Sequence, residues 1–161
     1  TLLKSINFLK YKIKIKLLIL GNGIEQSNLD YYIKENNLGN HVKIKNFIDN
    51  PYPYILKSDL FILSSKYEGL PNVLLEAAVL KKFIISTNCP TGPKEILLNG
   101  KGGYLFSVGD YKKLSKLILL FLKNRNKLKN KINYTYKGLF RYDLKRNLMK
   151  YYMLLIPFLR S

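Results

Sequence analysis

The sequence predicts a doubly wound α/β domain, in which helices cover both faces of a parallel sheet. Two observations carry this prediction. Short apolar runs rich in β-branched residues recur along the chain, and such runs are typical of buried parallel strands. Segments with apolar residues at helical spacing separate these runs, and that alternation indicates right-handed crossover connections. A chain of 161 residues without an internal repeat suits a single domain, residues 1–161.

The first part of the chain alternates helices with three strands. Leu2, Leu3, Ile6 and Leu9 are spaced as on one helical face, whereas the run up to Leu20 is apolar and ends in a glycine turn. The expected helices are Thr1–Tyr11, Ile24–Asn37 and Pro53–Ser58, and the expected strands are Ile13–Leu20, Val42–Phe47 and Leu60–Leu63.

The remainder continues the alternation and ends in basic helices. A helix is expected from about Pro71 to Leu80, because proline is tolerated in a first helical turn. The later elements are strands at Phe83–Ser86 and Gly102–Phe106, a helical turn at Lys94–Leu98, a helix at Tyr111–Lys123 and helical structure beyond Asn124. Because a chain of this class normally opens with a strand, we expect that an earlier strand is missing.

The net charge of +18 admits three explanations. Nucleic-acid binding requires basic residues clustered with aromatic ones, and membrane binding requires them on one face. The third explanation is a general bias toward Lys, Asn, Ile and Tyr, with no partner implied. The lysines are spread along the whole chain, which favours the third explanation and leaves membrane contact as the second.

Several classes are excluded by simple patterns. No secretory signal is visible, and no apolar run approaches the ~20 residues that cross a bilayer. A single cysteine, Cys89, excludes an internal disulfide and offers no metal framework. A cytoplasmic location fits these features, with peripheral contact at the inner face of the cytoplasmic membrane as an addition.

Ligands of open parallel sheets bind beyond the carboxyl ends of the strands. The segments that follow the predicted strands are Gly21–Gly23, Ile48–Asn50, Ser64–Gly69 and Thr87–Pro93. Glu68 precedes the predicted helix start and Glu76 lies about one and a half turns inside it. Free backbone amides between them, at Asn72 to Leu74, would form a phosphate site, and the carboxylates would accept hydroxyl hydrogen bonds. A nucleotide sugar supplies both kinds of group.

The residues around this pair resemble the GT4-type (group 1) retaining glycosyltransferases. Glu68 and Glu76, with seven residues between them, match the paired-glutamate signature of that family, and the surrounding run 64–77 is similar almost throughout. Ser86–Leu97 and Leu18–Gly23 resemble two further family stretches in the same order. The likeness covers roughly residues 1–123 and implies a Rossmann-like domain, the C-terminal, donor-binding half of a GT-B fold.

The resemblance implies specific roles. Glu68 would be the catalytic residue beside the donor sugar and its diphosphate, and Glu76 would hold the ribose hydroxyls. The base would lie near Phe47–Asn50. The complete set of expected donor-binding residues is Gly21, Asn22, Gly23, Phe47, Ile48, Gly69, Leu70, Pro71, Asn72, Val73, Leu74 and Glu76.

The implied enzyme transfers a sugar, from a UDP-sugar, to a glycan or lipid-linked acceptor in bacterial surface polysaccharide synthesis, with retention of configuration. The family generally needs no divalent metal, and neither a cofactor nor a metal ligand set is expected here. The family's diphosphate-binding arginine and lysine have no match in this chain. We therefore expect that these residues and an N-terminal acceptor domain lie upstream, and that the chain alone is inactive.

Two alternatives stay open at this stage. A nucleotide-sugar epimerase shares the two-domain architecture, and a basic nucleic-acid-binding module would explain the charge. His41 and Cys89 are expected to be structural, the first at the surface and the second packed at a strand end. The aromatic and basic tail, Tyr134–Leu159, would be core packing, an interdomain surface or a membrane-docking surface.

Overall fold

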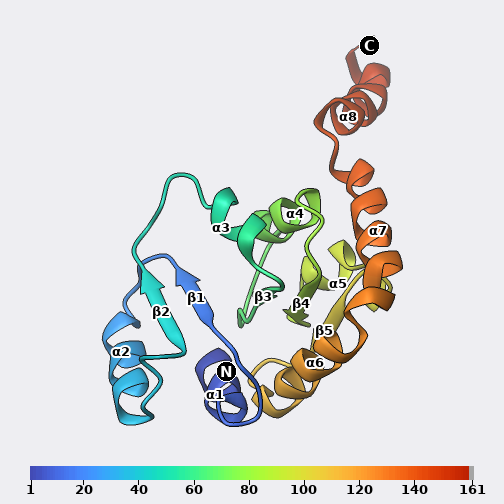
Figure 1. Cartoon of the computed structure of the whole chain (residues 1–161). Helices are drawn as coiled ribbons and strands as arrows, with labels where there is room; N and C mark the ends of the chain where they lie inside the picture. Colours follow the sequence, from blue (N-terminus) through green and yellow to red (C-terminus); the bar gives the residue numbers. More distant parts are fainter. Residues whose placement is uncertain (160–161) are drawn as a thin grey trace.

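The computed structural model describes residues 1–159 and has three layers, with strands between two groups of helices (Figure 1). The strands are β1 (Leu17–Leu20), β2 (Val42–Lys45), β3 (Phe61–Leu63), β4 (Ile84–Thr87) and β5 (Tyr104–Phe106). The helices are α1 (Leu2–Leu9), α2 (Gln26–Glu35), α3 (Tyr52–Lys57), α4 (Asn72–Val79), α5 (Pro93–Ile96), α6 (Tyr111–Asn124), α7 (Lys129–Gly138) and α8 (Leu144–Leu159). The predicted order of elements and the α/β class are confirmed.

Strand β1 is shorter than the predicted Ile13–Leu20. The amides of Lys12 and Ile13 both donate to the carbonyl of Leu9, at 2.8 and 3.1 Å, so the chain there still closes the end of α1. The apolar pattern continued back to Ile13 because that side chain packs beside the core rather than because it lies in a strand. Similarly, β2 ends at Lys45 instead of Phe47.

All strand pairs are parallel, but the hydrogen-bonded ladder is in two pieces. Strands β1 and β2 form one sheet, in the register Leu17↔Val42 to Leu20↔Lys45. Strands β3, β4 and β5 form the other, in that order. The doubly wound parallel arrangement predicted from the sequence is present, while its hydrogen bonding is interrupted between β1 and β3.

The core fills both faces of β4. Consecutive strand residues point to opposite faces, so Ile85 packs with α1 and α6 while Ile84 packs with α3, α4 and α5. Phe83 anchors the first cluster, because its ring stacks on Phe121 with centroids 5.4 Å apart and meets Tyr104 edge-on at 4.9 Å. These contacts fix α6 across the three-stranded sheet.

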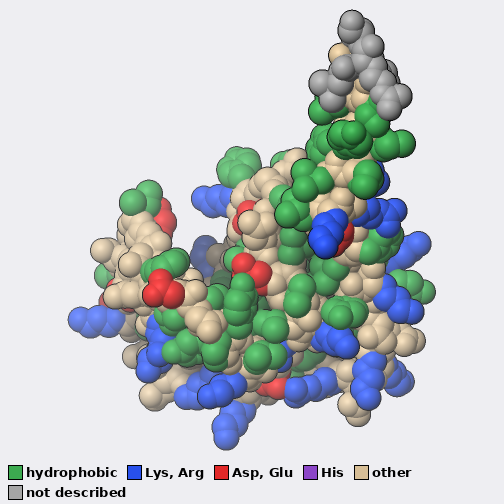
Figure 2. All heavy atoms as spheres, turned by 90° about the horizontal axis from the view of Figure 1, so that it is seen from above, with side chains coloured by type: hydrophobic (Ala, Val, Ile, Leu, Met, Phe, Trp, Pro, Cys, Tyr) green, Lys and Arg blue, Asp and Glu red, His purple; other side chains and the backbone are tan. Residues whose placement is uncertain are grey.

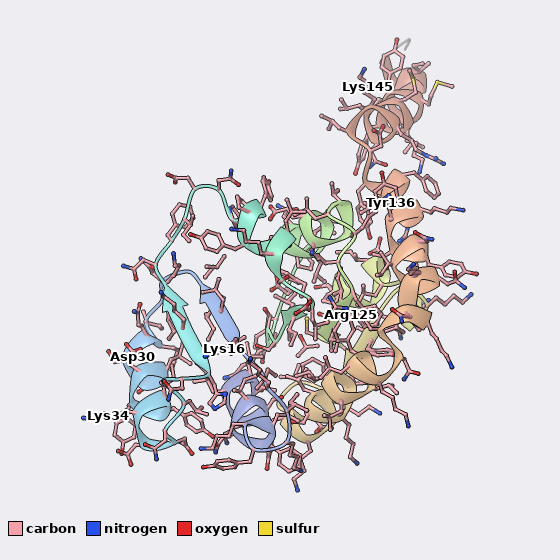
Figure 3. All side chains as sticks on the ribbon, viewed as in Figure 1. Lys16, Asp30, Lys34, Arg125, Tyr136 and Lys145 are labelled. Atoms are coloured by element: carbon pink, nitrogen blue, oxygen red, sulfur yellow. The ribbon has the colours of Figure 1, made fainter. Side chains whose placement is uncertain are left out.

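The tail divides into a packed helix and an exposed one. The Thr135 hydroxyl in α7 donates to the carbonyl of Gly102 at 2.6 Å, and Thr135 is buried, so this part of the tail is core packing. Helix α8 stands away from the body, and its Leu154 and Phe158 are 67% and 78% exposed (Figures 1 and 3). Core packing is therefore wrong as an explanation for α8.

The cationic side chains are dispersed, and several stabilise chain turns. On the face shown in Figure 2, Lys and Arg lie around the rim instead of gathering into one patch. Lys10 donates to the carbonyl of Asn36 at 2.6 Å, and Lys131 donates to that of Gly100 at 2.7 Å. Lys82 reaches the carbonyls of Leu56 and Ser58. These ammonium groups satisfy main-chain oxygens that turns leave unpaired.

Across residues 1–159, no helix combines the length and the apolar character that spanning a membrane requires.

Candidate functional site

The carboxyl edge of the strands brings the predicted loops together in two groups. In the first group, the Asn22 side-chain oxygen accepts a hydrogen bond from the Phe47 amide at 2.7 Å. This contact joins the glycine turn after β1 to the segment after β2. Gly21 has a φ of +126°, a backbone conformation that favours glycine, so the turn needs that residue. Phe47 is 73% exposed and Ile48 is half-buried, which leaves the Phe47 ring available to a ligand.

A contact between β2 and α3 supports the same segment. The Lys45 ammonium donates to the Tyr54 hydroxyl at 3.0 Å and lies 4.8 Å from the centre of the Tyr54 ring. This hydrogen bond from Lys45, and then its positive charge, lower the pKa of Tyr54. The pair closes the base of the long segment that arches from β2 to α3 in Figure 1. Sequence reasoning did not single out this pair.

The second group is built on the segment between β3 and α4. Glu68 is half-buried, Gly69 and Leu70 are exposed, and Pro71 is buried at the cap of α4. The Thr91 hydroxyl donates to the main-chain carbonyl of Glu68. The backbone of the Glu68 segment is thus held in place while the Glu68 carboxylate has no ion-pair partner within residues 1–159.

Gly92 locks the loop after β4 against the Glu68 segment. Its φ is +86°, and a Cβ added there would lie 2.4 Å from the Gly69 carbonyl oxygen and 2.4 Å from Cδ of Pro71. Both values are far inside van der Waals contact, so only glycine fits. The Thr87 hydroxyl adds a hydrogen bond to the Ser65 carbonyl at 2.8 Å. In the sequence, the glycine and hydroxyl residues of the run 87–93 were the signal from which this contact with the Glu68 segment could have been predicted.

The start of α4 offers two free amides instead of the three expected. The Leu74 amide donates to the Pro71 carbonyl at 2.9 Å, so it is not free as predicted, while Leu74 as a donor-binding residue stays a prediction. The Leu74 side chain is completely buried in the core, which explains its place in the motif. The amides of Asn72 and Val73 precede the first helical hydrogen bonds, and both residues are exposed. They can bind an anion, aided by the helix dipole.

Glu76 lies in the second turn of α4. It is half-buried and, like Glu68, has no ion-pair partner among the described residues. The two carboxylates therefore come from the segment before the helix and from the helix itself, with the free amides between them. This arrangement can hold a phosphate at the amides and hydroxyl groups at the carboxylates.

Within residues 1–159, no side-chain hydrogen bond or ion pair joins the two groups. Seen from above, the surface is hollowed between the part that contains β1, β2 and α2 and the larger part (Figure 2). The structure thus joins Gly21–Gly23 to Phe47 through the Asn22 hydrogen bond, and separately has Glu68 in the segment before α4 and Glu76 inside α4.

The residues expected to be structural are so. Cys89 is buried, and its thiol lies 3.9 Å from the Thr91 carbonyl, inside the loop that Gly92 holds. His41 precedes β2, at the opposite edge, and its Nδ1 lies 3.1 Å from the Ile15 carbonyl. Among residues 1–159, no three His, Cys, Asp or Glu side chains gather as a metal-binding group would.

These features define a class: an α/β domain whose ligand site lies at the carboxyl edge of parallel strands, with a helix start that suits phosphate. Residues 1–138 match the family model of glycosyl transferases group 1. The chain belongs to the group 1 glycosyltransferases.

Curated relatives are similar to parts of the chain. An uncharacterised glycosyltransferase of Methanocaldococcus jannaschii is 44% identical over 82 residues, 51% of this chain and 20% of the relative. The N-acetylgalactosamine-N,N'-diacetylbacillosaminyl-diphospho-undecaprenol 4-alpha-N-acetylgalactosaminyltransferase of Campylobacter jejuni is 29% identical over 147 residues, 89% of this chain and 40% of that enzyme. The chain thus spans less than half the length of these relatives.

Solved structures show the same fold. The crystal structure of Anabaena HepE in complex with UDP superposes with a TM-score of 0.85 at 18% identity, covering 98% of this chain and 45% of that one. The crystal structure of TarM gives the same TM-score at 19% identity and covers 96% of this chain and 31% of that one. The C-terminal-domain fold of a GT-B glycosyltransferase is therefore confirmed. The names of these proteins favour neither the epimerase nor the nucleic-acid-binding alternative.

Proposed function

We propose that this chain is the donor-binding part of a retaining glycosyltransferase that takes its sugar from a UDP-sugar. One observation carries the proposal. Two half-buried carboxylates without ion-pair partners, Glu68 and Glu76, flank the free amides at the start of α4. Phosphate groups suit the amides and sugar hydroxyls suit the carboxylates, so a nucleotide sugar matches both. The UDP named for the HepE crystal structure supports this choice of nucleotide.

Each residue has a part in this mechanism. The amides of Asn72 and Val73 stabilise negative charge on the diphosphate as the bond to the sugar breaks. Glu68 orients the sugar beside the diphosphate, and Glu76 accepts hydrogen bonds from the ribose hydroxyls. The exposed Phe47 ring covers the uracil. Catalysis then rests on positioning and fixed electrostatics more than on acid–base chemistry from this part of the enzyme.

The acceptor and location are also proposals. A glycan or lipid-linked acceptor, bound by a separate N-terminal domain, is supported by the diphospho-undecaprenol in the name of the Campylobacter relative. Such an acceptor places the reaction at the cytoplasmic face of a membrane, where the basic α8, with Lys145, Arg146 and Lys150, is available for peripheral contact. Retention of configuration is supported by the paired-glutamate resemblance alone.

Amide NMR of the chain during titration with UDP tests the nucleotide site. We expect shifts at Gly21–Gly23, Phe47 and Gly69–Glu76, and weaker shifts with GDP. Glu76→Gln removes a charge-assisted hydrogen bond and should raise the Kd for UDP by about tenfold or more. Asp30→Asn, an exposed carboxylate on α2 (Figure 3), is the matched control and should leave the Kd unchanged.

The same titration also tests whether UDP binding needs a divalent metal and whether it needs residues upstream of Thr1. We propose that UDP binds without a divalent cation, so the same shifts should occur in EDTA. If millimolar UDP causes no shifts, the titration is repeated on a protein extended upstream of Thr1. Absence of binding in that longer protein would overturn the donor-site proposal.

A further inference from the structure

The segment 46–51 contains Phe47, whose exposed ring is proposed to cover the uracil, yet it has no regular secondary structure. It joins β2 to α3 and forms the arch between them in Figure 1. Only Ile48 and Pro51 in this range are partly buried, and the other residues are exposed. Packing therefore does little to fix the segment, and a ligand that uses Phe47 would have to order it on binding unless another contact does so first.

Hydrogen bonds fix each end of the segment locally. At the first end, the Phe47 amide donates to the Asn22 side-chain oxygen at 2.7 Å. At the second end, the Tyr52 amide donates to the Asn50 side-chain oxygen at 3.2 Å and begins α3. Each of these bonds joins the segment to its own neighbourhood, and neither connects one end to the other.

A single side-chain pair connects the two ends. Lys45 is the last residue of β2 and Tyr54 lies in the first turn of α3, and both are partly buried. The Lys45 ammonium donates to the Tyr54 hydroxyl at 3.0 Å and lies 4.8 Å from the centre of its ring. Within residues 1–159 it is the only side-chain hydrogen bond between β2 and α3. Because it closes a loop of the chain, it reduces the conformations open to the segment.

The surrounding charges leave the Lys45 ammonium to Tyr54. Among residues 1–159 the one ion pair is that of Arg125 with Asp59, so the neighbouring Asp49 carboxylate does not bind Lys45. The hydrogen bond from Lys45 is the first cause that lowers the pKa of the Tyr54 hydroxyl, followed by the Lys45 charge, with smaller contributions from Lys57 and Lys43. The pKa of Tyr54 therefore reports directly whether the pair is formed.

We propose that Lys45 and Tyr54 are positioning residues of the nucleotide site, because their hydrogen bond closes the segment 46–51 and holds the Phe47 ring in place before the nucleotide binds. The inference rests on the proposed function, which assigns the uracil to Phe47. Neither side chain has to contact the nucleotide. The effect is confined to the base, because the diphosphate is assigned to amides of α4, which is a separate element.

NMR relaxation of backbone amides without any ligand tests the first step. Tyr54→Phe removes the hydroxyl and keeps the ring, so the order parameters of residues 46–50 should fall from about 0.85 to about 0.6 or less. Tyr52→Phe is the matched control on the same helix, because the Tyr52 hydroxyl makes no hydrogen bond within residues 1–159. Unchanged order parameters in Tyr54→Phe would overturn the proposal, whether or not UDP binds.

Titration with UDP and with inorganic pyrophosphate tests the effect on binding. Tyr54→Phe should raise the Kd for UDP by about three- to tenfold, since the segment must then be ordered on binding. The Kd for pyrophosphate, which has no base, should stay unchanged when it is followed at the amides of Asn72 and Val73. An equal loss for both ligands, or no loss for UDP, would overturn the positioning role. Absence of UDP binding to the unsubstituted chain would contradict the proposed function instead, and the order parameters would then decide on the pair.

Substitutions of Lys45 provide an independent readout. Lys45→Met removes the donor, so it should raise the pKa of Tyr54 toward its ordinary value, measured by NMR of the tyrosine ring, and weaken UDP binding as Tyr54→Phe does. Lys45→Arg keeps a charged donor that can stack on the Tyr54 ring, so UDP affinity and the low pKa should both be retained. Lys43→Gln is the matched control, with a smaller effect on the pKa. A raised Tyr54 pKa with unchanged UDP affinity in Lys45→Met would overturn the proposal.

Discussion

The part built on β3, β4 and β5 and the part built on β1, β2 and α2 differ in how they are held together. The three-stranded part has buried clusters on both faces of β4. In the two-stranded part, α2 contains no buried residue, and its small cluster depends on Leu3 and Ile6 of α1. The two-stranded part therefore has little core of its own and is stabilised chiefly through α1.

The largest expected effect is the loss of Phe83 from the three-stranded part. Phe83→Ala removes a fully buried ring stacked on Phe121 and should lower the free energy of unfolding by about 3–5 kcal/mol. Urea denaturation followed by circular dichroism measures it. A loss under ~1 kcal/mol would show that this cluster is not the main source of stability.

Gly92→Ala probes the lock between the loops of the three-stranded part. Backbone strain at φ +86° and the close approach to the Gly69 carbonyl should together cost about 3 kcal/mol. The matched control is Gly109→Ala, which has a φ of +85° and nothing within 4 Å of the added Cβ, so it should cost only ~1 kcal/mol. Equal costs in urea denaturation would mean that the close contact is unimportant.

A smaller effect is expected for α2. Leu29→Ala removes a half-buried side chain that packs on the cluster of the two-stranded part, so it should cost about 1 kcal/mol. Native-state hydrogen exchange would sharpen the comparison. We expect the β1 and β2 amides to open at lower free energy than those of β4. Identical opening free energies would contradict a lower stability of the two-stranded part.

The smallest effect is expected at the ion pair of Arg125 with Asp59. Their side chains are 57% and 67% exposed, so solvent screens the interaction. Asp59→Asn should change the free energy of unfolding by no more than ~0.5 kcal/mol, and less at high salt. A salt-insensitive loss above 1 kcal/mol would contradict this.

Much of the fold could be predicted because its signals are local. Apolar runs and helical periodicity predicted every strand and the helices through α6 in order, including the brief turn at α5, whereas the tail was predicted only as helical and divides into α7 and α8. The limits of β1 could not be predicted, because Ile13 is apolar for packing while the backbone beside it closes α1. The interruption of the ladder also left no pattern, since an apolar strand has the same sequence whether or not a neighbour pairs with it.

For the candidate site, the sequence predicted the segments but not their supports. Glu68 and Glu76 were found by their place around a helix start, and the structure puts the free amides of Asn72 and Val73 between them. The Leu74 amide was assigned wrongly, because its bond to Pro71 depends on how the helix begins. The Gly92 lock and the Lys45–Tyr54 pair join loops distant in sequence, which a single sequence does not reveal.

The lysines that donate to main-chain carbonyls have a practical consequence for chemical modification. Lys10, Lys82 and Lys131 act as structural donors, each closing a turn that belongs to a neighbouring element. Reductive methylation keeps the positive charge and leaves one N–H donor on each dimethylated ammonium, so each lysine can keep one hydrogen bond to a main-chain carbonyl. Acetylation neutralises the ammonium group, and a reagent of that kind would loosen several turns at once. For this basic chain, crystallisation or labelling protocols should therefore alkylate the amines and avoid acylating them.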